Sequence, residues 1–286
     1  MVAIVGAGRM GAAMAGRLLR AGESVTVYNR TRERAEAIEG ATVAGTARDA
    51  AAGAEVVIVS LADDDAARDA YGGPEGLVAG LRPGTVVLET STLSPSAVRE
   101  LAPLVEERGA ALLDAPVSGS VPLVERGELT FMVGGDAPAL EAVRPVLDIL
   151  GKRVFHLGGH GAGATMKLAV NSALHGLNQA IAEALVLAEK AGIERSAAYE
   201  VFASSALAAP FVLYKRAAYE RPDETPAAFT LGLVAKDLAL AAGLAAEADT
   251  PMPQLTVNRN VVAAALDAGL AEADMSALAV LLRDYS

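Results

Sequence analysis

The sequence contains no cysteine, and this absence removes several kinds of chemistry from consideration. Disulfides, thiolate catalysis and cysteine-ligated zinc or iron–sulfur sites are all excluded. Of the three histidines, His156 and His160 lie in a glycine-rich stretch, and two such histidines do not make a metal site. We therefore expect no bound metal.

An excess of positive charge is also missing. The formal net charge is -11, whereas a nucleic-acid-binding protein normally presents a basic face. No stretch reaches the roughly 18 uncharged apolar residues that a membrane span needs. Met1 leads directly into the apolar run Val2–Val5, with no basic segment before it, so no targeting signal is expected. These features predict a cytoplasmic protein without a nucleic-acid or membrane partner.

Aromatic residues are few, at 4%, although apolar residues as a whole make up 52% of the chain. Much of that apolar content is alanine, which loses no side-chain entropy in a helix and favours close helix packing. The 286 residues suffice for one large domain or two ordinary ones. The composition predicts a largely helical fold with a substantial core.

The first half of the chain alternates short apolar runs with amphipathic segments. The runs are rich in valine and are predicted strands: Val2–Val5, Ser24–Tyr28, Val56–Ser60, Val86–Glu89, Ala111–Asp114 and Thr130–Val133. The predicted helices between them are Met10–Ala21, Arg32–Glu39, Ala66–Tyr71, Ser96–Arg108 and Ala137–Leu150. This alternation predicts an α/β Rossmann-type domain whose mostly parallel sheet is covered by helices.

The pattern changes near residue 160, where a glycine-rich connection is expected to close the first domain. A long helix is predicted over Ala164–Lys190, and no convincing strand follows it. The further predicted helices are Ser196–Leu207, Phe211–Tyr219, Ala228–Ala248, Gln254–Ala268 and Met275–Arg283. We expect an NADP-binding Rossmann domain over residues 1–161. An all-α domain for substrate binding and dimerisation is expected over residues 162–286, joined through the long helix.

A glycine motif follows the first predicted strand. Gly6-Ala7-Gly8-Arg9-Met10-Gly11 fits the pattern G-x-G-x-x-G and opens a helix. Glycines there allow a tight turn and let the backbone approach a pyrophosphate, whose charge is met by free N–H groups of the helix. The motif predicts dinucleotide binding, the alternative being a strand–helix turn that is merely glycine-rich.

The end of the second predicted strand bears on which dinucleotide is bound. An NAD-preferring site usually has a carboxylate there for the ribose hydroxyls, and a carboxylate repels a 2′-phosphate. Here the run is Asn29-Arg30-Thr31, which offers a guanidinium and a hydroxyl instead. The run favours NADP, with NAD also possible if Arg30 is only a solvated loop residue.

At this point the sequence resembles the β-hydroxyacid dehydrogenase, or 3-hydroxyisobutyrate dehydrogenase-related, family over nearly its whole length. The resemblance is carried, in the family's order, by Gly6–Gly11, Glu89–Pro95, Asp114–Ser120 with Gly127–Thr130 and Gly134–Gly135, Gly161–Gly163 with Lys167 and Asn171, and Lys236–Leu238. One departure is visible, because the family usually has a second glycine where this chain has Ser120. That difference bears on the substrate and leaves the reaction class as it is.

The resemblance implies roles for individual residues. Lys167 is implied to be the proton donor and Asn171, four residues on along the same helix face, a second catalytic residue. The substrate is implied to bind Ser118, Gly119, Ser120 and Lys236. The cofactor is implied to contact Gly6, Ala7, Gly8, Arg9, Met10, Gly11, Asn29, Arg30, Thr31, Leu61, Ala62, Thr92 and Lys236. Asp237 is expected to pair or cap locally, and His175 to pack.

The implied activity is reversible hydride transfer between NADP(H) and a small β-hydroxyacid or the matching semialdehyde or keto acid. The Asn29–Thr31 run favours the glyoxylate and succinic semialdehyde reductase branch. Two alternatives stay open: an imine reductase, which usually lacks the lysine, and a non-catalytic dinucleotide-binding protein. The extensive apolar helix of the second half predicts a homodimer or homotetramer.

Overall fold

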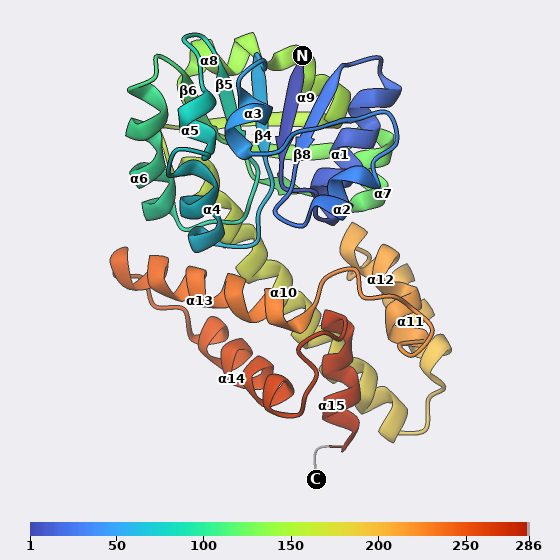
Figure 1. The fold of residues 1–286 in the computed structure, drawn as a ribbon. Helices are drawn as coiled ribbons and strands as arrows, with labels where there is room; N and C mark the ends of the chain where they lie inside the picture. The colour runs from blue at the N-terminus through green and yellow to red at the C-terminus, as the bar shows by residue number, and fades with distance from the viewer. Residues whose placement is uncertain (285–286) are drawn as a thin grey trace. The chain divides into compact units, whose positions relative to one another are not determined.

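The computed structural model describes residues 1–284, which form two compact units, one over Met1–Lys167 and one that begins at Leu168. The first unit holds the sheet and the second is helical (Figure 1). Among the described residues, no helix is long and apolar enough to cross a membrane. The predicted order of an α/β Rossmann-type unit followed by an all-α unit is confirmed.

The sheet of the first unit has nine strands in the order β3-β2-β1-β4-β5-β6-β8-β7, with β9 on the other side of β8. Their bounds are β1 Val2–Val5, β2 Val25–Tyr28, β3 Thr42–Val43, β4 Val56–Val59, β5 Val86–Glu89, β6 Ala111–Asp114, β7 Val117–Ser118, β8 Leu129–Gly135 and β9 Gly151–Gly158. The strands from β3 to β6 are parallel, so their carboxyl ends share one edge. The strand order changes direction between β1 and β4. Sheets of this kind bind ligands at the carboxyl ends of the strands beside such a point.

Strands β6 and β7 run along the same side of β8 in one continuous antiparallel register. Asp114 pairs with Gly134, and Val117 pairs with Phe131. The carbonyl of Pro116, between the two strands, accepts a hydrogen bond from Met132 N. The segment from Asp114 to Ser118 is therefore extended and anchored where it leaves the parallel sheet.

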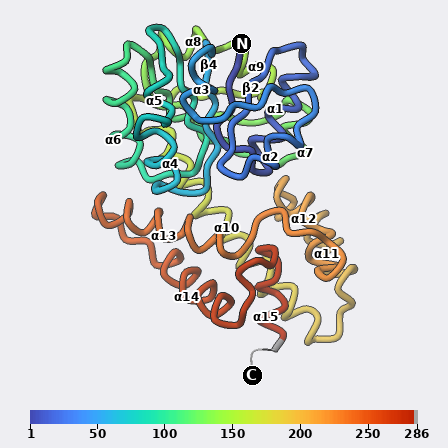
Figure 2. Tube along the Cα trace, in the orientation of Figure 1, coloured from blue at the N-terminus to red at the C-terminus, as the bar shows by residue number. Residues whose placement is uncertain are grey.

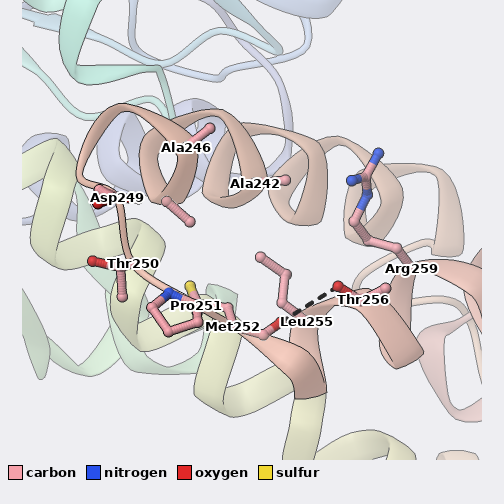
Figure 3. A pocket seen from close by; sticks show the side chains of 10 residues that line it. Ala242, Ala246, Asp249, Thr250, Pro251, Met252, Leu255, Thr256 and Arg259 are labelled. Carbon is pink, nitrogen blue, oxygen red and sulfur yellow. Dashed lines mark hydrogen bonds between the residues drawn. The ribbon is translucent and has the colours of Figure 1, made fainter.

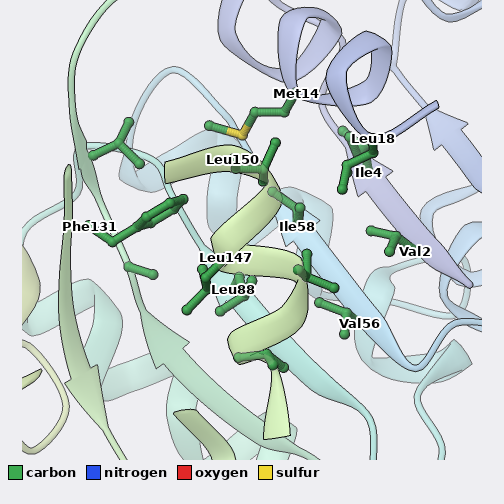
Figure 4. Close-up of a cluster of buried hydrophobic side chains, with 14 of the residues drawn as sticks. Val2, Ile4, Met14, Leu18, Val56, Ile58, Leu88, Phe131, Leu147 and Leu150 are labelled. Carbon is green, nitrogen blue, oxygen red and sulfur yellow. The ribbon is translucent and has the colours of Figure 1, made fainter. Parts of the chain in front are cut away.

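Helices cover both faces of this sheet (Figure 1). They are α1 Arg9–Arg20, α2 Arg32–Glu36, α3 Ala47–Ala51, α4 Asp64–Tyr71, α5 Leu77–Gly80, α6 Pro95–Glu106, α7 Val121–Arg126, α8 Ala137–Ala142 and α9 Arg144–Leu150. Alternate residues of each strand point to opposite faces, so Ile4 and Ile58 join one apolar cluster, whereas Val5 and Val59 join the other. Figure 4 shows the first cluster, in which Leu18 of α1 packs over the strands.

The structure differs from the predicted elements of this unit in several places. The short elements β3, β7, α3, α5 and α7 have no counterpart among the predicted strands and helices. The single helix expected over Ala137–Leu150 is broken at Val143, because Pro145 lacks an N–H and its ring clashes with the preceding turn. The glycine-rich connection expected over residues 156–163 begins instead inside the edge strand β9. Most β9 residues are exposed, so they show no apolar alternation that could have predicted a strand.

The second unit is built from the remaining helices. These are α10 Ala162–Lys190, which starts in the first unit, α11 Arg195–Ser204, α12 Pro210–Glu220, α13 Leu231–Glu247, α14 Pro253–Asp267, the 3-10 turn η1 Met275–Ala277 and α15 Leu278–Asp284. Helices α13 and α14 lie side by side along the trace (Figure 2). One apolar cluster joins these helices, and a buried ion pair between Lys215 and Asp274 lies beside it.

Candidate active site

The glycine motif forms a tight turn from β1 into α1. Gly6 has φ +103, and a Cβ there would lie 2.2 Å from Ser60 O; a Cβ on Gly11 would lie 1.9 Å from Gly6 O. At Gly8 a Cβ would meet nothing within 4 Å, so the backbone faces open space. Helix α1 has no side-chain cap and no acidic residue in its first turn. Open backbone at an uncapped helix start fits a pyrophosphate.

Asn29, at the end of β2, is bonded to the backbone of its surroundings. Its Oδ1 accepts from Ala7 N at 2.9 Å, and its Nδ2 donates to Thr31 O at 2.8 Å. The side chain thus ties the glycine loop to the loop after β2, a role that its sequence position did not suggest. Arg30 and Thr31 are exposed beside it.

The loops after β4 and β5 are joined by Ser91. Leu61 N donates to Ser91 Oγ at 2.8 Å, and Thr90 Oγ1 donates to Val59 O at 2.6 Å. These bonds bring the loop that carries Leu61 and Ala62 next to the loop that carries Thr92. The candidate cofactor residues from neighbouring strand ends are therefore held as one group.

A buried glutamate supports this pair of loops. Glu89 Oε1 accepts from Ser91 N at 2.9 Å, and Oε2 accepts from Tyr71 Oη at 3.0 Å. Burial raises the pKa of Glu89 to about 7, although the bonds from Ser91 and Tyr71 act in the opposite direction. In the sheet, Glu89 is paired with Asp114, so two buried acids stand in register at the carboxyl edge.

Asp114 bonds the start of α10. Its Oδ1 accepts from Gly161 N at 3.0 Å and its Oδ2 from Ala164 N at 2.8 Å. Burial raises the pKa of Asp114, opposed by these backbone bonds. A Cβ on Gly163 would lie 2.3 Å from Met132 O, so glycine allows the first turn of α10 to pack directly on the strands.

The ammonium of Lys167, in the second turn of α10, donates to Val117 O at 2.8 Å. That carbonyl immediately precedes the small-residue loop Ser118–Ser120. Gly119 in this loop has φ +141, where L residues are strained, whereas Ser120 has φ −121, which any residue adopts. The backbone thus accommodates the departure at Ser120 and explains why Gly119 is a glycine.

The second unit holds its own polar cluster on α10 and α13. Asn171 Nδ2 donates to Asp237 Oδ2 at 2.6 Å, and Lys236 Nζ lies 3.2 Å from Asp237 Oδ1. His175 Nε2 is 3.7 Å from Asp237 Oδ2, and its ring packs 5.9 Å from that of Phe229. Asp237 pairs with its neighbour as expected, and it also binds Asn171, which sequence reasoning missed.

The sequence-predicted residues therefore fall into three groups. In the first unit, one group joins the glycine loop to Asn29 and to the loops with Leu61 and Thr92, and another joins Lys167 to the carbonyl that precedes Ser118–Ser120. In the second unit, Asn171 is joined to Lys236 through Asp237. Sequence reasoning missed Glu89 and Asp114 as site residues. A carboxylate that ends an apolar strand was the available signal.

A separate hollow lies within the second unit between α13 and α14 (Figure 3). It is lined by Ala242, Ala245, Ala246, Asp249, Thr250, Pro251, Met252, Leu255, Thr256 and Arg259. None of the candidate site residues is among them. Across residues 1–284, no group of three or more His, Asp or Glu side chains could hold a metal ion.

Comparison with known proteins identifies the family to which the chain belongs. Residues 1–158 match the model for the NAD-binding domain of 6-phosphogluconate dehydrogenase, and residues 161–282 match that for the NAD-binding domain of NADP-dependent 3-hydroxyisobutyrate dehydrogenase. Together the two models cover most of both units of the chain.

Similar proteins cover the chain nearly from end to end. An NAD-dependent L-serine dehydrogenase of Pseudomonas aeruginosa is 38% identical, over 96% of this chain and 95% of its own. Glyoxylate/succinic semialdehyde reductase 2 of Arabidopsis thaliana is 33% identical, over 99% of this chain and 79% of its own. The solved structure of Psf3 in complex with NADP+ and 2-OPP superimposes with a TM-score of 0.92 at 27% identity, covering 99% of this chain and 100% of that one. The chain is an oxidoreductase that belongs to the 3-hydroxyisobutyrate dehydrogenase-related family of hydroxyacid dehydrogenases.

Proposed function

We propose that this enzyme transfers a hydride reversibly between NADP(H) and a small β-hydroxyacid or the matching semialdehyde or keto acid, with Lys167 as general acid and base. The observation that carries the proposal is the bond from Lys167 Nζ to Val117 O, 2.8 Å long. It holds an ammonium directly beside Ser118–Ser120, at the sheet edge that also carries the glycine loop.

In the direction of reduction, the ammonium of Lys167 donates a proton to the carbonyl oxygen of the substrate while the carbonyl carbon accepts a hydride. When bound, NADPH supplies that hydride. The positive charge of Lys167 also stabilises the developing alkoxide. In the direction of oxidation, the neutral amine takes the hydroxyl proton. Asn171 hydrogen-bonds the substrate or orients the lysine from the next turn of α10.

The substrate carboxylate is proposed to bind the backbone N–H groups and hydroxyls of Ser118–Ser120, together with the ammonium of Lys236. The cofactor is proposed to lie along Gly6–Gly11, Asn29–Thr31, Leu61–Ala62, Thr92 and Lys236. The open backbone at Gly8 supports the pyrophosphate position. The proposed domains are a cofactor-binding domain of residues 1–161, which also contributes Ser118–Ser120 to substrate binding, and a substrate and dimerisation domain of residues 162–286, which also contributes Lys236 to cofactor binding.

NADP is the proposed cofactor because no acid ends β2, and Arg30 is exposed there to meet a 2′-phosphate. The relative solved with NADP+ is consistent with this choice, whereas the L-serine dehydrogenase relative is named for NAD. We propose glyoxylate or succinic semialdehyde as the substrate class, by analogy with the plant relative.

A homodimer or homotetramer is proposed as the working form. Apolar side chains of the second unit, Leu187, Val201 and Val257 among them, are exposed in the single chain, and a partner copy would cover them. Light scattering should give a multiple of the 29.0 kDa chain mass; a single 29.0 kDa species would contradict the proposal.

The test is a panel of initial rates with NADPH and with NADH. Reduction of glyoxylate, succinic semialdehyde, methylmalonate semialdehyde and tartronate semialdehyde is compared with oxidation of L-serine and with reduction of a cyclic imine. The proposal expects the fastest turnover with NADPH and a carboxylate-bearing aldehyde. Turnover of the imine alone, or dinucleotide binding without turnover of any member, would overturn it.

A further inference from the structure

Asp114 connects the edge of the sheet to the helix that carries Lys167. It ends β6, is 1% exposed, and uses both carboxylate oxygens on N–H groups at the start of α10. Ala164, one of the two donors, precedes Lys167 by three residues, which is less than one helical turn. Any shift at this start of the helix therefore reaches the lysine directly.

The same short segment also holds the other end of the lysine. Three residues after Asp114, the carbonyl of Val117 accepts the hydrogen bond from Lys167 Nζ. The register of β6 and β7 against β8 is unbroken across this segment, so the positions of Asp114 and Val117 are set together. Backbone and ammonium of the lysine are thus fixed by one extended stretch.

Close packing against the strands fixes the position of the first turn of α10. A Cβ on Gly163 would lie 2.6 Å from Asp114 O as well as 2.3 Å from Met132 O. A negative charge at the beginning of a helix is also favourable, because the N–H groups there carry partial positive charge. The carboxylate of Asp114 therefore satisfies two backbone donors that are buried against the sheet.

We propose that Asp114 is a positioning residue for Lys167, acting through the first turn of α10. Only the expected effect on turnover rests on the proposed function, because the environment of the lysine can be measured in the absence of catalysis. Asp114 does not touch the substrate in this account. Its part is to hold the ammonium at Val117, beside the loop Ser118–Ser120.

Asp136 offers a control for the loss of a helix-capping bond. It too is an aspartate that bonds the start of a helix, accepting from Ala139 N at 3.2 Å, but it caps α8, which carries no candidate site residue. Asp136 is exposed whereas Asp114 is buried, so the comparison accounts for the capping bond, and the Lys167 readouts below separate positioning from burial. Asp114→Asn keeps the size of the side chain and one acceptor, and it serves beside Asp114→Ala in case the alanine variant does not fold.

The first measurement is the acylation rate of the Lys167 amine by an acetyl ester, read by peptide mass spectrometry without substrate or cofactor. The inference expects this rate to change several-fold in Asp114→Asn and to stay unchanged in Asp136→Asn. An unchanged rate in Asp114→Asn overturns the inference, whatever the lysine does in catalysis.

The second measurement is turnover. Asp114→Asn should lower kcat by about 10- to 100-fold, the range expected when a catalytic group is misplaced, while NADPH affinity stays the same. In a Lys167→Ala background the same change should have no further effect, because there is no ammonium left to position. Full additivity of the two losses would overturn the inference. If Lys167→Ala left turnover intact while Asp114→Asn altered acylation, the proposed function would fail and the positioning role would stand.

Discussion

Replacing Glu89 by glutamine should change how folding stability depends on pH. Glu89 is 1% exposed, and burial raises its pKa from 4.5 to about 7. The unfolded chain loses this proton near pH 4.5, whereas the folded chain keeps it to about pH 7. Between those values the folded state binds more protons, so this group makes the protein less stable as the pH rises.

The size of the effect follows from the difference between the two pKa values. A shift from 4.5 to about 7 corresponds to about 3 kcal/mol of unfolding free energy at high pH. Glutamine is neutral throughout and keeps a carbonyl acceptor for Ser91 N. The stability of Glu89→Gln relative to the unmodified protein should therefore rise by about 2 to 3 kcal/mol between about pH 5 and about pH 8.

Urea unfolding followed by circular dichroism at a series of pH values measures this difference. The exposed Glu125→Gln provides the control, and its stability should run parallel to that of the unmodified protein. If Glu89→Gln and the unmodified protein kept a constant difference, within about 0.5 kcal/mol, across the whole range, the reasoning would be refuted.

Three further substitutions test the buried ion pair of the second unit, the backbone at Gly119 and the cofactor preference. Lys215→Met leaves Asp274 buried without its ammonium and should lower the free energy of unfolding in urea by about 3–5 kcal/mol. The exposed Lys190→Met, as control, should change it by almost nothing. A loss below about 1 kcal/mol in Lys215→Met would contradict the expectation. Gly119→Ala forces an L residue to φ +141 and should destabilise the fold by about 1–3 kcal/mol. Arg30→Asp should weaken NADPH binding relative to NADH on the order of tenfold in fluorescence titrations, the equivalent of one lost charge-assisted bond; an unchanged ratio would argue against NADP selection at this loop.

Most of the parallel part of the sheet could be predicted because its strands are short apolar runs, whereas the two-residue strand β3 was missed. Val2–Val5 and Val56–Val59 are buried on both faces and contain no turn residue. The glycine motif was predictable for the same reason, since its position after a strand is a local property of the chain. Residues at β9 were missed because an exposed edge strand carries no apolar alternation.

The connections between side chains were not predictable from the sequence. Nothing local shows that Asn29 bonds Ala7, or that Asp114 bonds residues 47 to 50 positions later, because these contacts depend on which strands become neighbours. The bond between Asn171 and Asp237 is of the same kind, since it joins two helices. The resemblance to the family implied the candidate lysine, whereas the groups that hold it required the fold.

The proton-donor role of Lys167 is best examined by single-turnover reduction of a carboxylate-bearing aldehyde by NADPH-loaded Lys167→Ala, followed by the absorbance of the reduced cofactor. Loss of the proton donor should slow this step by on the order of 10²-fold or more, while NADPH affinity remains that of the unmodified protein. Hydride transfer at an undiminished rate in this variant would contradict the assignment of Lys167 as the general acid.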